Sequence, residues 1–242
     1  MKESLDSFQI AIDGPVAAGK GTVSKLVAER LDFLYVDTGA MYRVTALLAI
    51  RAGVSLDDEA ALAQLVAKAH LEMRNPNEIE RDGRLTTVIL DGEDVSWKIR
   101  TEEVSASASR VAQYPAVREQ LVAKQQAIAV SQDVVMEGRD ITYRVLPHAQ
   151  LKVFLTASDI VRAKRRHVQL MTRGQDISLE DVFHDLVERD KQDSTRSVDP
   201  LQIVEDAWVV DTSDLDIDEV IELIVAKARL MKEADVTSIV PQ

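Results

Sequence analysis

The sequence predicts an α/β fold in which a five-stranded parallel sheet is covered by helices on both faces. Short apolar runs alternate with helical patterns along the 242-residue chain, and such runs between turn residues are typical of buried strands. The predicted core strands are residues 8–12, 33–36, 133–136, 151–155 and 208–210. Because the carboxyl ends of parallel strands meet at one edge of the sheet, we expect the functional site at that edge.

A glycine-rich turn follows the first strand, and we call it the phosphate loop. Its residues are Gly14, Pro15, Val16, Ala17, Ala18, Gly19, Lys20, Gly21 and Thr22. A helical pattern continues from it, so backbone N–H groups and the helix dipole favour an anion there. Lys20 can reach the outer phosphates of a nucleotide, and a hydroxyl such as that of Thr22 can hold Mg²⁺. Gly21 stands between these two residues, a spacing that resembles nucleoside monophosphate kinases. The alternative is a glycine-rich turn that binds no ligand.

Composition restricts the class of partner. The chain has 29 basic and 41 acidic side chains and a net charge of −12, which disfavours binding to nucleic acid or to a membrane surface. It has no cysteine, which excludes disulfides and thiolate metal sites, and its four histidines have no shared ligand spacing. No apolar run approaches the ~18 residues of a membrane helix. We expect a cytoplasmic monomer with one domain over residues 1–242.

Helical patterns fill the segments between the strands. Ser55 and Asp58 resemble a capping box for the helix that ends near His70, and Pro115 suits the first turn of another helix. The other expected helices run from the phosphate loop to Leu31, from Asp37 to about Gly53, from Thr101, from Pro115 to about Val130, from Ser158, from Ser178 to about Gln192 and from Asp218 to about Lys232. We expect residues 234–242 to be frayed.

The pattern changes between about residues 70 and 100. Apolar runs at 71–73 and 85–90 read as short antiparallel strands, because turn sequences such as Arg81-Asp82-Gly83 and Asp91-Gly92 flank them. We expect a small β-rich insert there, between core regions at 8–69 and 101–232.

Two strand ends carry further polar clusters. After the second strand, Thr38 offers a hydroxyl at a helix N-terminus and Arg43 follows one turn later, which suits a second anion. Helix capping alone is the commoner explanation of such a stretch. After the third strand, Arg139 offers a bidentate fork for phosphate and Asp140 can accept from an amino group. A structural Arg139–Asp140 ion pair is the alternative.

Two charged segments follow in the second half. Arg189, Asp193 and Arg196 recur at i+4 and i+7, so one helical face would present two cations and a carboxylate. Arg162, Arg165 and Arg166 precede residues 172–176, which contain Gly174, and cationic helices around a mobile loop fit a lid over a triphosphate. An ordinary solvated face is the alternative for both segments.

Together these residues resemble bacterial cytidylate kinases, over about residues 8–230 and in the order of that family. The resemblance rests on residues 12–22, 37–43, 91–95, 99–101, 109, 117–118, 138–140 and 188–190. It implies a P-loop kinase core, a monophosphate-binding insert at 70–100 and a helical lid at 162–196. The implied activity is phosphoryl transfer from ATP, bound with Mg²⁺, to CMP or dCMP.

The resemblance also implies roles for single residues. The phosphate loop would bind ATP, and Lys20 would bridge the donor and acceptor phosphates. The acceptor phosphate would be held by Thr38, Arg43 and Arg139, with Tyr42 in the same substrate site. The cytosine edge would be read by Ser109, Arg118 and Asp140. Arg189 and Asp193 would reach the ribose or the phosphate, while Arg196 and Arg165 would close over the transferring group. The implied catalytic residues are Lys20, Arg139, Arg189 and Arg196, and the implied metal-binding residue is Thr22.

One stretch departs from the family pattern. The chain has Thr142-Tyr143-Arg144-Val145 where the family usually has Gly-Thr-Val-Val, which alters the local backbone and adds a cation. Arg139 and Asp140 themselves are retained. Thr38 replaces the more common Ser and keeps the hydroxyl.

The chemistry of such a reaction agrees with the residues present. The second pKa of a phosphate monoester is about 6, so the acceptor oxygen is ionised at pH 7 and needs no general base. The requirement is to neutralise and align two anions, which Lys20 and several arginines can do. Two other functions remain open. Another P-loop small-molecule kinase would not need Ser109, Arg118 and Asp140 together, and a nucleotide-dependent switch would normally carry an Asn-Lys-x-Asp sequence, which is absent.

Overall fold

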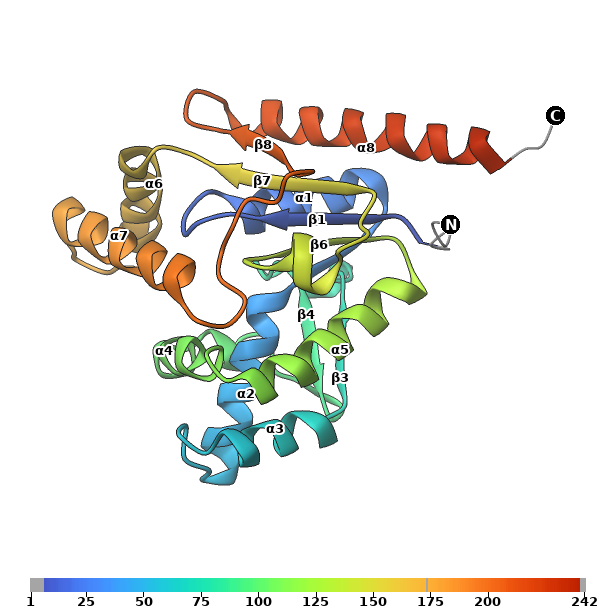
Figure 1. The fold of residues 1–242 in the computed structure, drawn as a ribbon. Coiled ribbons are helices and arrows are strands. Elements are labelled where there is room, and N and C mark those ends of the chain that lie inside the picture. The colour runs from blue at the N-terminus through green and yellow to red at the C-terminus, as the bar shows by residue number, and fades with distance from the viewer. Residues whose placement is uncertain (1–6, 173, 240–242) are drawn as a thin grey trace.

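The computed structural model describes residues 7–172 and 174–239. Its large sheet is formed by β1 (Gln9–Asp13), β2 (Leu34–Asp37), β6 (Val134–Gly138), β7 (Leu151–Thr156) and β8 (Trp208–Asp211). The strand order is β2-β6-β1-β7-β8, and every neighbouring pair is parallel (Figure 1). The predicted five-stranded parallel sheet is therefore confirmed.

Helices cover both faces of this sheet. Along β1, Ile10 and Ile12 belong to the core under α1 (Lys20–Leu31) and α8 (Ile217–Ile239), while Ala11 belongs to the opposite core. That second core is built with α2 (Thr38–Ala52), α3 (Glu59–Lys68), α4 (Glu102–Val111) and α5 (Pro115–Ser131). Since successive side chains of a strand alternate between faces, a fully apolar strand supplies both cores at once.

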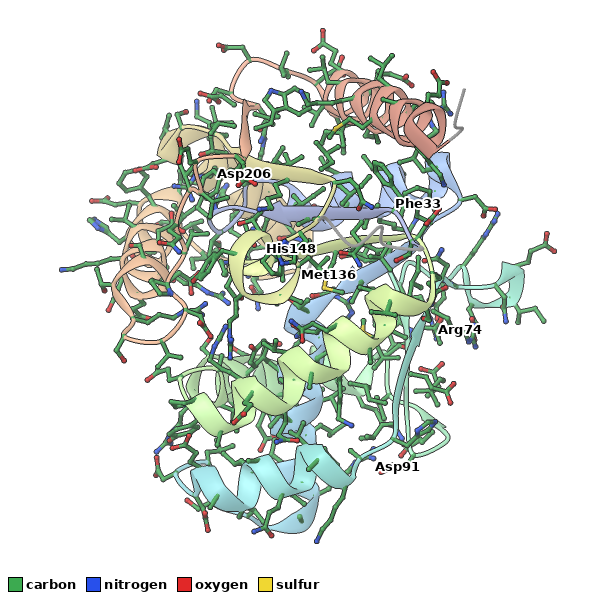
Figure 2. The ribbon with its side chains drawn as sticks, turned by 45° about the vertical axis from the view of Figure 1, so that its right-hand side comes forward. Phe33, Arg74, Asp91, Met136, His148 and Asp206 are labelled. Carbon is green, nitrogen blue, oxygen red and sulfur yellow. The ribbon has the colours of Figure 1, made fainter. Side chains whose placement is uncertain are left out.

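The insert is a three-stranded antiparallel sheet. It consists of β3 (Leu71–Arg74), β4 (Thr87–Leu90) and the two-residue β5 (Glu93–Asp94), with 3₁₀ turns at Glu78–Glu80 and Lys98–Arg100. Figure 2 labels Arg74 at one end of this sheet and Asp91, just after β4, at the other. The β-rich character expected for this region is confirmed, although β4 begins two residues after Leu85 and β5 was not foreseen.

Two helices lie beyond the carboxyl ends of the core strands. α6 (Asp159–Thr172) packs against α7 (Leu179–Thr195), and Figure 1 shows the pair on the side toward which the arrows of β1 and β7 point. Gly174, expected to break the helix, has a φ of +79° in the connection between them. Arg173, in the expected mobile loop, lies outside the described residues.

Three local features differ from expectation. Asp58, not Ser55, caps α3, because its side chain accepts from the Ala61 N–H at 3.0 Å while the Ser55 hydroxyl accepts from Asp57. α8 extends to Ile239, so the expectation that the chain frays from residue 234 is wrong for residues 234–239. Residues 240–242 lie outside the described part of the chain. A π-helical turn, Ile141–Val145, follows β6. Within the residues that the structure describes, no helix is long and apolar enough to cross a membrane.

Candidate active site

A cleft of about 1330 Å³ opens at the carboxyl edge of the sheet. It collects most of the predicted site residues, although they come from distant parts of the chain. Those that line it are Ala17, Ala18, Gly19, Lys20, Gly21, Thr22, Thr38, Tyr42, Arg43, Ser109, Arg118, Arg139, Asp140, Arg165, Arg189, Asp193 and Arg196. Gly14, Pro15 and Val16 do not line the cleft and form the start of the loop beside it.

The phosphate loop has the backbone that its glycines predict. A Cβ at Gly14 would lie 2.0 Å from the Leu155 carbonyl oxygen, so no other residue fits between β1 and β7. Gly19, with a φ of +90°, ends the loop at the N-terminus of α1. The Lys20 ammonium donates to the carbonyl oxygens of Gly14 and Pro15, at 2.8 Å each. Lys20 therefore closes the loop on itself.

Lys20 lies in an environment that disfavours its positive charge. Burial and, to a lesser extent, Arg139 lower its pKa, Glu137 and Asp13 act in the opposite direction, and the net pKa is about 7. A polyanion arriving in the loop would favour the protonated lysine. The surroundings of Lys20 therefore suit an anionic ligand.

Glu137 is a half-buried carboxylate to which sequence reasoning assigned no role. It is the penultimate residue of β6, and the Tyr35 hydroxyl donates to its Oε1 at 3.1 Å. Burial raises its pKa, as does nearby Asp37, while Lys20 and Arg139 lower it. A Cβ at Gly21 would lie 3.4 Å from the same oxygen, so the carboxylate lies beside the first turn of α1. The only signal in the sequence was an acidic residue at the end of a core strand.

Helix capping, one of the two explanations offered for residues 37–43, is confirmed. Asp37 caps α2 by accepting from the Ala40 N–H at 3.0 Å, and it forms an ion pair with Arg43 at 2.5 Å. Burial raises the pKa of Asp37, but Arg43 and Arg100 together lower it below its ordinary value. The Arg43 Nε atom is buried without a hydrogen-bond partner, and the Thr38 hydroxyl donates to the Glu137 carbonyl at 2.7 Å. An arginine and a hydroxyl therefore border the cleft.

Arg139 and Asp140 do not pair with each other, so the structural ion pair considered above is wrong. Asp140 accepts from Arg118 at 2.5 Å, and Arg139 pairs with Asp193 at 2.6 Å. The Arg118 guanidinium also lies 5.5 Å from the centroid of the Tyr42 ring. Burial raises the pKa of Asp140, and Arg118 and Arg196 oppose that rise. Two adjacent residues thus face two different partners across the cleft.

Residues at the end of α7 face the same cleft, as their spacing predicts. Asp193 holds Arg139, and Arg196 lies 3.8 Å from Asp140. Arg189 makes no hydrogen bond or ion pair with any of the residues described by the structure, and burial together with Arg139 lowers its pKa. Ser109, on α4, borders the cleft opposite these cations. An arrangement with excess positive charge is suited to a polyanionic ligand.

Arg162 does not behave as a lid cation. Its side chain is 4% exposed, donates to the Val16 carbonyl at 2.8 Å and pairs with Asp190 at 2.5 Å. Asp190 in turn accepts from the Val16 N–H at 3.0 Å. The pair fastens α6 and α7 to the phosphate loop, so the solvated face considered above is wrong for Arg162. Arg165 donates to the Thr212 carbonyl at 2.7 Å and borders the cleft.

The segment that departs from the family pattern has a defined structure. Asp13, at the end of β1, accepts from the N–H groups of Ile141 and Thr142 at 2.9 and 2.8 Å and from the Thr142 hydroxyl at 2.7 Å. Burial raises the Asp13 pKa, while these hydrogen bonds favour the ionised carboxylate. Asp13 therefore fixes the turn that follows Arg139 and Asp140.

The donor atoms near the loop suit a hard cation. Thr22 presents a hydroxyl to the cleft and Glu137 lies beside the same turn of α1. Among the described residues there is no group of three histidine, cysteine or acidic side chains that could hold a metal ion by itself. Oxygen donors of this kind fit Mg²⁺, which usually binds one or two protein groups and completes its shell with phosphate and water.

Comparisons with known proteins agree with this geometry. The family model described as cytidylate kinase matches residues 10–230. The cytidylate kinase of Geobacillus sp. (strain WCH70) is 47% identical over 219 residues, which cover 90% of this chain and 95% of the relative. That of Pelotomaculum thermopropionicum is 46% identical, with 92% and 97% covered, and that of Shouchella clausii is 46% identical, with 90% and 94% covered.

Proposed function

Because the chain belongs to the cytidylate kinase family, we propose that its cleft transfers the γ-phosphoryl group of ATP to CMP or dCMP, giving ADP and CDP or dCDP. The observation that carries this function is the position of the Arg118–Asp140 pair in the same cleft as the phosphate loop. One end of the cleft is suited to phosphates. The other offers a carboxylate to an exocyclic amino group, which cytosine has and uracil lacks.

The donor is bound by the phosphate loop. Its backbone N–H groups and the N-terminus of α1 attract the phosphates of ATP. Lys20 leaves the carbonyl groups of Gly14 and Pro15 and donates to phosphate oxygens instead. Mg²⁺, bound with ATP beside Thr22 and Glu137, would supply further neutralisation of phosphate charge.

The acceptor is held by residues on the opposite side of the cleft. Arg43 and Thr38 border the place of its phosphate, and Arg139, steadied by Asp193, offers a guanidinium fork to the same group. Asp140 accepts from the cytosine amino group, with Ser109 and Arg118 along the edge of the base. Arg189 and Asp193 are placed for the ribose or the phosphate.

Transfer then depends on alignment and charge rather than on proton removal. The phosphate of CMP is already ionised at pH 7, and its oxygen attacks the γ-phosphorus directly. Lys20, Arg139, Arg189 and Arg196 carry the positive charge that the transferring group meets. Preorganised charges of this kind act mainly on the transition state.

A coupled assay of ADP formation tests the function. With ATP and Mg²⁺, we expect CMP and dCMP to be phosphorylated in preference to UMP and AMP, and we expect a chelator of Mg²⁺ to abolish turnover. A faster reaction with AMP, or with an acceptor that is not a nucleotide, would assign the cleft to another P-loop kinase. Stabilisation by GTP without any transfer would favour the nucleotide-dependent switch.

A further inference from the structure

The loop that follows α7 is held by two residues that depart from the family pattern. In the π-helical turn after Asp140, the Tyr143 hydroxyl donates to the Pro200 carbonyl at 2.6 Å. The neighbouring Arg144 places its Nε 3.7 Å from Asp199 Oδ1. The turn therefore fastens residues 199 and 200 next to the base-reading end of the cleft.

Asp199 contacts two arginines of the acceptor site at once. Its Oδ2 accepts from Arg118 Nε at 2.7 Å, and its backbone carbonyl accepts from Arg196 Nε at 2.7 Å. Its φ of +45° lies in the left-handed region, which an aspartate tolerates better than most residues. The side chains of Arg118 and Asp199 are 2% and 17% exposed. A buried arginine thus lies between two carboxylates from different parts of the chain.

This arrangement decides which atoms of Asp140 remain for a ligand. Arg118 donates to Asp199 through Nε, to the Ala112 carbonyl through Nη1 and to Asp140 Oδ2 through Nη2. Because Nε of Arg118 donates to Asp199, Arg118 donates to Asp140 through Nη2 alone. The other carboxylate oxygen of Asp140, Oδ1, lies 3.8 Å from Arg196. A guanidinium whose Nε is released can instead form a two-pronged pair with a carboxylate, which would occupy both oxygens.

We propose that Asp199 is a positioning residue for the acceptor nucleotide, and that Tyr143 and Arg144 hold it in place. By engaging Nε of Arg118, Asp199 keeps one oxygen of Asp140 available to the amino group of the base. Through its backbone carbonyl it also sets the direction of Arg196. The inference rests on the proposed function, because it concerns the binding of CMP in that cleft.

Steady-state kinetics with ATP and CMP test the inference. Asp199→Ala should raise KM for CMP by about tenfold, since it removes a charged hydrogen bond from a buried arginine. KM for ATP should change by less than about twofold, because the phosphate loop is untouched. Asp199→Asn keeps a hydrogen-bond acceptor and tolerates a positive φ, so its KM for CMP should lie between those of the wild type and Asp199→Ala. Tyr143→Phe should raise KM for CMP by about threefold, the scale of one neutral hydrogen bond.

Tyr114→Phe is the matched control, since the Tyr114 hydroxyl is 3.4 Å from Asp57 and does not touch this loop. The positioning role would be overturned if Asp199→Ala changed KM for CMP and KM for ATP equally, or if it left KM for CMP unchanged. If Asp199→Ala fails to fold, the same comparison of KM for CMP with KM for ATP is made on Asp199→Asn and Tyr143→Phe. If the wild type phosphorylates CMP and the variants keep its KM for CMP, only this inference is refuted. If the wild type does not phosphorylate CMP, the proposed function is refuted as well.

Discussion

At the scale of single residues, the site is governed by buried charge. Lys20 shows the consequence most clearly, because its ammonium donates to two carbonyl groups and, among the described residues, to no carboxylate. A lysine paired with a carboxylate would have to give up that ion pair to place its ammonium on a phosphate. The carbonyl groups are weaker competitors, so the lysine exchanges them readily for a phosphate oxygen.

We expect Lys20→Ala to lower kcat by about 10²-fold or more, the usual scale for removal of one preorganised charge from an active site. The fold should survive, since the removed side chain bonds only to its own loop. Turnover of ADP formation and the thermal unfolding midpoint measure the two effects separately. Lys25→Ala is the control, because Lys25 pairs with Glu29 on the outer side of α1. Near-native kcat in a folded Lys20→Ala variant would remove Lys20 from the mechanism.

At the scale of elements, the insert packs Met73, Val88 and Leu90 into the core shared with α2 to α5 and also carries several ion pairs. Arg74 pairs with Glu80 through two hydrogen bonds of 2.6 Å, and Arg84 joins Asp82 to Asp94. The Trp97 indole donates to Asp82 at 2.8 Å at the border of the cleft. The shape of this wall of the cleft thus depends on surface ion pairs.

One such pair gives a prediction for pH. Hydrogen bonds from Arg74 and from the Asn77 N–H lower the pKa of Glu80 from 4.5 to about 2. A carboxylate whose pKa is lowered by folding stabilises the native state above its unfolded pKa, and that contribution is lost as pH falls from about 4.5 to about 2. The titration of Glu80 followed by carbon NMR should show a midpoint near 2. Arg74→Ala should return it toward ~4.3, and an unchanged midpoint in that variant would contradict the pairing.

α6 and α7 form the element pair expected to act as a lid. The Arg162–Asp190 contact fastens the start of α6 and the last part of α7 to the phosphate loop, so we expect a closing movement to be centred on residues 174–178. Arg189 and Arg196 lie at that end of α7 and border the cleft. Two polyanions would neutralise the repulsion among these cations and draw them inward.

Hydrogen exchange across the apo, ATP-analogue, CMP and ternary states tests closure. We expect residues 162–196 to gain the most protection in the ternary state, with the gain centred on 174–178. Residues near Arg162 and Asp190 should change less, because this contact already fastens them to the phosphate loop. Protection in the apo protein equal to that in the ternary state would show a rigid helix pair and would refute the lid.

The elements were largely predictable from the sequence, while their polar contacts were not. Apolar runs and the glycine-rich loop predict the parallel sheet because local patterns report burial and turn geometry directly. The π-helical turn was not predictable, since it depends on Asp13, which lies 128 residues before Ile141. Asp199 was missed for the same reason: its partner Arg118 is 81 residues away, and no local spacing connects them.

At the scale of the whole molecule, the fold brings five distant segments to one edge of the sheet. The phosphate loop, the start of α2, the region of α4 and α5, the end of β6 and the end of α7 all border one cleft. Figure 1 shows that these segments come from nearly the full length of the chain. We propose that donor and acceptor bind in this one cavity and that the Arg118–Asp140 pair selects the base.

The ratio of kcat/KM for CMP to that for UMP tests this account most directly, measured in the wild type and in Asp140→Asn and Asp140→Ala. A carboxylate accepts from the cytosine amino group and is left unpaired against the uracil carbonyl, so the wild type should prefer CMP strongly. Asp140→Ala should lower the ratio by at least about tenfold, and Asp140→Asn should lower it further, because its amide can donate to uracil. Asp133→Asn, next to the other end of β6, should leave the ratio unchanged. Equal loss of activity on both nucleotides in the Asp140 variants would contradict the account.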